Sequence, residues 1–141
     1  KSTSKNVRYT IEDNFFTFWF RFIYKYSYML EIENYESLKT IINRDYETFS
    51  GLMLERYFRR VLIERKAYTR IGGWWDRKGE NEIDIIAENE LNDEATFFEV
   101  KCKAANIDRK LLEQKAAVFQ RATGEFKGYR ISCKGLSMDD M

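Results

Sequence analysis

Two short apolar runs separated by a polar stretch place the strongest constraint on the fold of this chain. The runs are residues 83–87 (IDIIA) and 97–102 (FFEVKC), and the stretch 90–93 (ELND) lies between them. Apolar runs of this length predict β-strands, and a short polar connection predicts an antiparallel hairpin. The sequence therefore predicts two adjacent, well-buried strands in the second half of the chain.

Charged residues interrupt both runs, at Asp84 in the first and at Glu99 and Lys101 in the second. An acid two residues before a lysine occurs six times in the chain, but only the pair at Glu99 lies in an apolar run. Side chains at i and i+2 of a strand share a face, so Glu99 and Lys101 should be cofacial. An even loop without a bulge would set Asp84 opposite Glu99, with Cβ atoms roughly 5 Å apart.

Two facing carboxylates repel each other, and a bound divalent cation is the obvious compensation. Magnesium suits such a pair because it keeps several waters and needs only one or two protein carboxylates. We therefore expect the side chains of Asp84, Glu99 and Lys101 to converge on one cation site. The alternative is a surface hairpin whose charged face is merely solvated.

Composition limits the chemistry that is open to this chain. The 141 residues, 44% of them hydrophobic, suffice for one domain with a real core. Histidine is absent, which excludes imidazole bases and histidine-containing metal sites. Cys102 and Cys133 form no C-x-x-C pair, so we expect two buried core thiols in a reducing, cytoplasmic setting.

Charge is unevenly distributed although the net charge is only +1. Residues 79–100 hold eight acids and no base, whereas 55–78 hold eight bases to three acids and 101–134 hold nine bases to three acids. An acidic spot inside a basic surround would suit a protein that holds a phosphodiester backbone over a metal. Ordinary solvated charge on two amphipathic helices explains the same counts.

The first third of the chain predicts a short strand and two helices. Residues 7–11 alternate like a strand, Asp13 can cap an aromatic helix, and 34–43 predict a second helix. Aromatic residues occupy almost every face of the helix within 13–30, which predicts burial on more than one side, under the chain itself or against a partner. Arg21 and Lys25 make this a helix of a water-exposed protein instead of a membrane span.

A longer amphipathic helix is predicted from Glu47 to about Lys66, starting near Thr48 or Ser50. Glu55 would project near the edge of its apolar stripe, where it could be a third ligand. Pairing with Arg59 at i+4 is the other explanation of its position.

Strands at about 68–77, 82–88 and 95–103, a helix over 108–122 and a strand over 129–133 complete the predicted order: helix, three strands, helix, strand. Trp74 and Trp75 suit sheet-face packing, although a tryptophan at the sheet edge could also stack on a base. Gln114 and Lys115, on the later helix, could contact a phosphate or simply be solvated.

This order, with an acid in the first helix, an Asp in the second strand and Glu-x-Lys in the third, resembles the PD-(D/E)xK nuclease superfamily over roughly residues 47–134. The resemblance implies a restriction-endonuclease-like α/β fold and magnesium- or manganese-dependent hydrolysis of DNA. It implies that Asp84 and Glu99 are metal ligands, that Lys101 orients water or stabilises the transition state, and that Glu55 is the helix acid. Ile83 stands where the superfamily often has proline.

A narrower resemblance spans nearly the whole chain. Residues 8–15 and 18–22, Gly73-Trp74-Trp75-Asp76 and the two acidic motifs are similar to the C-terminal part of archaeal-type P-loop ATPases. It implies that 1–46 is a strand and aromatic connector ending a winged-helix region, that 47–141 is the nuclease-like domain, and that ATPase and winged-helix domains precede both. The first residue, Lys1, and the absence of a signal-like segment fit a piece of a longer protein.

Three functions follow as hypotheses. The first is a magnesium-dependent DNA nuclease. The second is a catalytically silent module of the same fold that binds nucleic acid or a protein partner of the parent ATPase. The third is a domain that assembles or regulates the ATPase, with homo-oligomers formed through the aromatic helix at 13–30.

Overall fold

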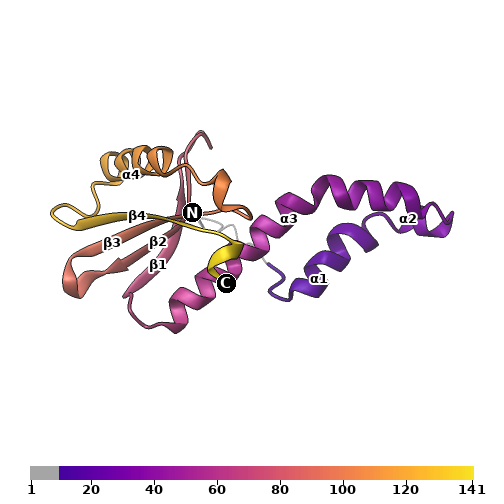
Figure 1. The fold of residues 1–141 in the computed structure, drawn as a ribbon, viewed down its shortest axis with the longest axis horizontal. Helices are drawn as coiled ribbons and strands as arrows, with labels where there is room; N and C mark the ends of the chain where they lie inside the picture. Colours follow the sequence, from indigo (N-terminus) through magenta and orange to yellow (C-terminus); the bar gives the residue numbers. More distant parts are fainter. Residues whose placement is uncertain (1–9) are drawn as a thin grey trace, which may run out of the picture. The chain divides into compact units, whose positions relative to one another are not determined.

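A computed structural model describes residues 10–141 of the chain, which form two compact units divided between Phe49 and Ser50 (Figure 1). The helices of the first unit are α1 (Asn14–Phe18), the π-helix η1 (Trp19–Tyr24) and α2 (Ser27–Glu31). Helix α3 (Tyr35–Glu64) passes through the boundary. Within residues 10–141 no helix combines the length and apolarity that crossing a membrane requires.

The aromatic segment of the first unit begins where its cap predicts. Asp13 accepts a hydrogen bond from the Phe16 amide at 2.9 Å, which ends the chain's irregular stretch and starts α1. Phe22 is fully buried and packs edge-on against Phe49, with ring centroids 5.5 Å apart. The predicted strand at 7–11 lies mostly outside the described residues, and Ile11 itself is irregular.

Most other aromatic rings of this segment are exposed, so the first alternative, burial on several sides by the chain itself, does not hold for the described residues. Phe22 is the one fully buried ring of the segment among the residues that the structure describes, and the exposed set is Phe15, Phe16, Trp19, Phe20, Tyr24 and Tyr28. Burial against a partner remains a prediction.

Helix α3 corrects the prediction of two separate helices over 34–43 and 47–66. It runs for 30 residues without interruption. Residues 43–47 contain neither proline nor glycine, and the Asp45 carboxylate binds the neighbouring Arg44 at 2.7 Å instead of capping a new helix. Thr48 and Ser50 therefore lie inside the helix and cap nothing.

The second unit is a mixed α/β layer structure built on a four-stranded sheet. The strands are β1 (Arg70–Trp75), β2 (Glu82–Asn89), β3 (Glu94–Val100) and β4 (Arg130–Leu136), in spatial order β1-β2-β3-β4. The first two pairings are antiparallel and the pairing of β3 with β4 is parallel. The predicted order of helix, three strands, helix and strand is confirmed, as is the hairpin, whose connection holds the short helix η2 (Glu90–Asn92).

Helix α4 (Arg109–Thr123) makes the crossover that a parallel β3–β4 pair requires. Asp108 caps its start by accepting a hydrogen bond from the Leu111 amide at 3.0 Å, and Gly124 ends it in the left-handed conformation at φ 68°. A short helix, η3 (Ala104–Asn106), precedes it. The predicted helix over 108–122 is confirmed to within one residue at each end.

A helix covers each face of the sheet (Figure 1). On what we call the α4 face, the core consists of Ile83, Ile86, Ala95, Phe97, Leu112, Ala116, Phe119, Phe126 and Cys133. On the α3 face, it consists of Leu54, Phe58, Leu62, Ile85, Ala87, Phe98 and Val100. The expectation of two core cysteines is right for Cys133 and wrong for Cys102, which is only half-buried because it lies beyond the end of β3.

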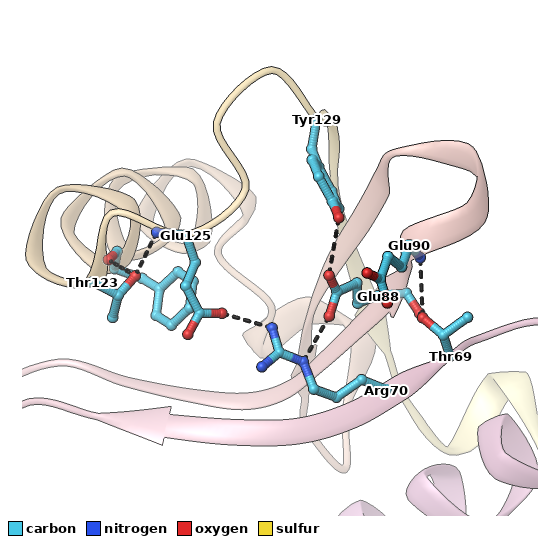
Figure 2. Close-up of polar contacts among 8 residues, drawn as sticks. Thr69, Arg70, Glu88, Glu90, Thr123, Glu125 and Tyr129 are labelled. Carbon is cyan, nitrogen blue, oxygen red and sulfur yellow. Dashed lines mark hydrogen bonds and ion pairs between the residues drawn. The ribbon is translucent and has the colours of Figure 1, made fainter.

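A polar network fastens β1 and β2 to the connection between α4 and β4 (Figure 2). Arg70 donates to the nearly buried Glu88 carboxylate at 2.6 Å and to Glu125 at 2.7 Å. The Tyr129 hydroxyl donates to the other Glu88 oxygen at 3.1 Å. The buried charge of Glu88 is thus matched by one cation and one neutral donor.

Candidate active site

The register of the hairpin brings Asp84 beside Glu99. Its last recorded pair is Ile85 with Phe98, so one further step would oppose Asp84 and Glu99. The Asp84 side chain instead turns between the strand ends, where Oδ2 accepts a hydrogen bond from the Val100 amide at 2.7 Å. That amide belongs to the peptide following Glu99, so the two acids are neighbours across the end of the ladder.

A bulge sets the orientation of Asp84. In the β1–β2 pairing Gly72 faces Ile86 and Trp74 faces Ile83, which leaves Gly73 opposite both Asp84 and Ile85. Ile83 and Ile85 consequently pack on different faces of the sheet, although regular alternation would put them on one. Asp84 therefore lies at the bulge, where side chains stop alternating regularly between the two faces of the sheet.

Glu99 is held on the α4 face by the alternation of β3. Phe98 and Val100 pack on the α3 face, and Phe97 packs on the α4 face. Since side chains two residues apart share a face, Glu99 projects to the same face as Phe97. It is only 5% exposed. Its Oε2 accepts a hydrogen bond from the Asp108 amide at 3.0 Å, while Oε1 lies 3.8 Å from both the Lys101 and the Lys115 ammonium nitrogens. A nearly buried carboxylate is thus surrounded by two cations and a backbone donor.

The two lysines differ in exposure because they come from different elements. β3 ends at Val100, so the prediction that this strand continues to 103 is wrong. Lys101 directly follows it, and the Lys101 amide still donates to the Leu136 carbonyl at 3.0 Å. Its side chain is 44% exposed, against 19% for Lys115 on α4. Lys101 lies on the same side as Glu99, as the two-residue period of a strand predicts. Of the two candidate residues on α4, only Lys115 reaches Glu99, and Gln114 is exposed.

Glu55 reaches the same region from the α3 side. Arg59 donates one hydrogen bond to the Glu55 carboxylate at 3.1 Å and another to the Asp84 carbonyl at 2.9 Å. The i+4 ion pair is therefore formed, and it connects α3 to the bulge. Burial, and next the negative charge of Asp84, raise the pKa of the Glu55 carboxyl.

Gly73 permits this connection because it has no side chain. A Cβ there would lie 3.0 Å from the Asp84 carbonyl oxygen and 3.3 Å from a guanidinium nitrogen of Arg59. Residue types alone do not show this close approach, which only the structure reveals. The Asp108 amide was likewise missed, since backbone donors leave no signal in residue types.

Asp84 and Glu99 offer the kind of oxygen ligand that a hard divalent cation prefers. Asp84 Oδ1 has no hydrogen bond to the described residues, and Glu99 Oε1 is engaged only at 3.8 Å by the two lysines. Across residues 10–141, no three acidic or thiol side chains lie close enough together to share one metal ion. Two carboxylates completed by waters match magnesium coordination, which needs no third protein acid.

Replacing Glu55 with glutamine tests the raised pKa of this carboxyl through the pH dependence of stability. A raised carboxyl pKa means that the folded state binds the proton more tightly than the unfolded state, so ionisation of Glu55 lowers stability as pH rises through and above its unfolded-state pKa. Glu55→Gln cannot ionise. Its free energy of unfolding, relative to that of the wild type, should therefore increase between about pH 4 and pH 7 in chemical denaturation.

Glu64→Gln is the control for this measurement, because Glu64 lies on the same helix and its 70% exposed side chain pairs loosely with Arg60 at 3.7 Å. A difference for Glu55→Gln that stays constant or decreases with pH would contradict the raised pKa of the Glu55 carboxyl.

Together these features define a mixed α/β domain with a carboxylate and lysine cluster at one end of its central hairpin. Residues 19–117 match a family described as archaeal and bacterial proteins of unknown function, and the chain belongs to this family. An uncharacterized protein of Methanocaldococcus jannaschii is 38% identical over 109 residues, which cover 71% of this chain and 24% of that protein. The chain thus corresponds to about a quarter of that relative's length, and no solved structure matches it significantly.

Proposed function

We propose that this chain is a magnesium-dependent DNA nuclease domain of the restriction-endonuclease-like, PD-(D/E)xK type. The observation that carries the proposal is Glu99, a nearly buried carboxylate that lies beside Asp84 and within 3.8 Å of both Lys101 and Lys115. Two acids and a lysine at the end of adjacent strands suit phosphodiester hydrolysis. The element order and the parallel β3–β4 pair support the same assignment.

Each residue has a distinct role in the proposed reaction. Asp84 and Glu99 would hold magnesium or manganese, which when bound supplies Lewis-acid stabilisation of the phosphate charge. Lys101 orients the attacking water and adds positive charge where the transition state becomes negative. Glu55 acts through Arg59, which fixes the backbone of Asp84.

Substrate contacts would come from α4. Lys115 lies at the Glu99 carboxylate and could move from it to a nonbridging phosphate oxygen, whereas the exposed Gln114 would meet the backbone further out. The parent protein would be cytoplasmic and would place ATPase and winged-helix domains before this region. The length of the relative supports a longer parent.

A catalytically silent, regulatory module that binds nucleic acid or protein is the second candidate. The observation in its favour is that Lys101 and Lys115 already balance the charge of Glu99 without a metal. Such a module could associate with itself or its parent through the exposed aromatic rings of residues 13–30.

Cleavage of supercoiled and linear DNA separates the two candidates. With magnesium or manganese the wild type should cut, and EDTA, Asp84→Ala and Lys101→Ala should each abolish cutting. Lys103→Ala is the matched control, because Lys103 is an exposed lysine two residues further along the chain. Cutting that survives in both site variants would indicate a contaminating nuclease, and failure of the wild type to cut with either metal would favour the silent module.

A further inference from the structure

A cavity of about 200 Å³ lies on the α4 face beside the edge strand β1. Its lining includes the aromatic residues Trp74, Phe119 and Phe126, together with Gly72 and Ile86. An apolar cavity of about 150 Å³ suffices for benzene, so the volume here is large enough for a somewhat larger ring. Its volume and aromatic lining favour an aromatic ligand.

The rim determines the polarity of that ligand. Arg70 is flanked by Glu88 and Glu125, which offset its charge (Figure 2). An isolated anion such as phosphate would meet two carboxylates there and is disfavoured. Among the described residues, Glu125 Oε1 and Arg70 Nη1 have no hydrogen-bond partner, so this ion pair leaves one acceptor and one donor at the rim. The edge of a nucleobase, with adjacent N–H and ring-nitrogen or carbonyl groups, complements this pair.

The cavity and the candidate active site are connected through the β1–β2 bulge. Gly73 borders the cavity and faces Asp84 across the bulge. The cavity also lies on the face of the sheet that carries Glu99 and Lys115. A nucleic acid strand with a phosphate at the carboxylates could therefore direct a neighbouring base toward Trp74.

We propose that this cavity binds an unpaired base of a single-stranded or frayed DNA substrate. The inference rests on the proposed nuclease function and specifies its substrate class. Stacking on aromatic side chains needs no particular base and requires the base to be out of a duplex. The cavity would therefore distinguish single-stranded from double-stranded DNA more than it would distinguish one base sequence from another.

Gly72→Leu is the variant that tests the cavity. Gly72 is the register partner of Ile86, so a side chain at 72 would point to the α4 face, into the cavity. A Cβ there would meet nothing within 4 Å, and the residue does not need a left-handed backbone. Gly51→Leu is the matched control, because a Cβ at Gly51 on α3 also meets nothing within 4 Å.

The measurement is fluorescence anisotropy with EDTA present, using a short labelled single strand and an abasic strand of equal length and charge. The wild type and Gly51→Leu should bind the base-bearing strand about tenfold more tightly, and Gly72→Leu should bind both strands with the affinity of the abasic one. Equal binding of the two strands by the wild type, or an intact preference in Gly72→Leu, would overturn the inference.

A measurement on the wild type alone guards against a Gly72→Leu variant that does not fold. A 2-aminopurine base in the single strand should lose fluorescence on binding as it stacks in the cavity, and unchanged fluorescence in the bound strand would also count against the inference. Because neither experiment needs cleavage, a protein that shows base preference but never cuts DNA would refute the nuclease function and leave the cavity assignment standing.

Discussion

Glu99→Gln is expected to reduce metal-dependent DNA cleavage about a thousandfold while leaving the domain folded. Glutamine has nearly the same shape and can still accept the hydrogen bond from the Asp108 amide at the Oε2 position. It removes the negative charge that would hold the cation and that lies 3.8 Å from Lys101 and Lys115. Initial rates of cleavage with magnesium, compared with the wild type, measure the loss.

Glu94→Gln serves as the control, because Glu94 lies at the start of the same strand and is paired with Arg130 in an exposed ion pair. Its cleavage rate should remain within about twofold of the wild type, as expected of an exposed ion pair that contributes little. Chemical denaturation of both variants gives the second readout. If Glu99→Gln lost stability but kept its cleavage rate, Glu99 would be a structural acceptor for the two lysines and not a metal ligand.

Local signals in the sequence were sufficient for much of the second unit. The hairpin follows from two apolar runs around a short polar connection, and α4 follows from its own cap at Asp108 and its stop at Gly124. Helix α3 shows the limit of such signals. A polar stretch at 43–47 resembles a break, but without proline, glycine or a capping side chain the backbone hydrogen bonds continue through it.

The candidate site was only partly predictable for a related reason. Glu99 and Lys101 are two residues apart, so strand geometry alone makes them cofacial. The position of Asp84 depends on a bulge created opposite Gly73, a residue of another strand. The approach of Lys115 depends on how α4 packs on the sheet. The positions of Asp84 and Lys115 relative to Glu99 therefore depend on interactions between distant segments, which residue spacing does not reveal.

Gly135→Ala is expected to lower the free energy of unfolding by about 2 kcal/mol, because it forces an extra methyl group into a packed contact. A Cβ at 135 would lie 2.5 Å from Cγ2 and 2.7 Å from Cδ1 of Ile107. Isoleucine is branched at Cβ and cannot easily rotate away. Gly72→Ala is the matched control on another strand, since its Cβ meets nothing within 4 Å, and thermal or chemical denaturation measures both.

The same substitution should also reduce cleavage about tenfold, because Ile107 precedes the residue whose amide holds Glu99. Gly135 is the register partner of Glu99 on β4, so a displaced Ile107 would shift Asp108 at the site itself. Adding Ile107→Ala removes the clashing atoms, and the double variant should recover most of both losses relative to Gly135→Ala. Purely additive losses in the double variant would show that Gly135 matters for a reason other than the position of Ile107.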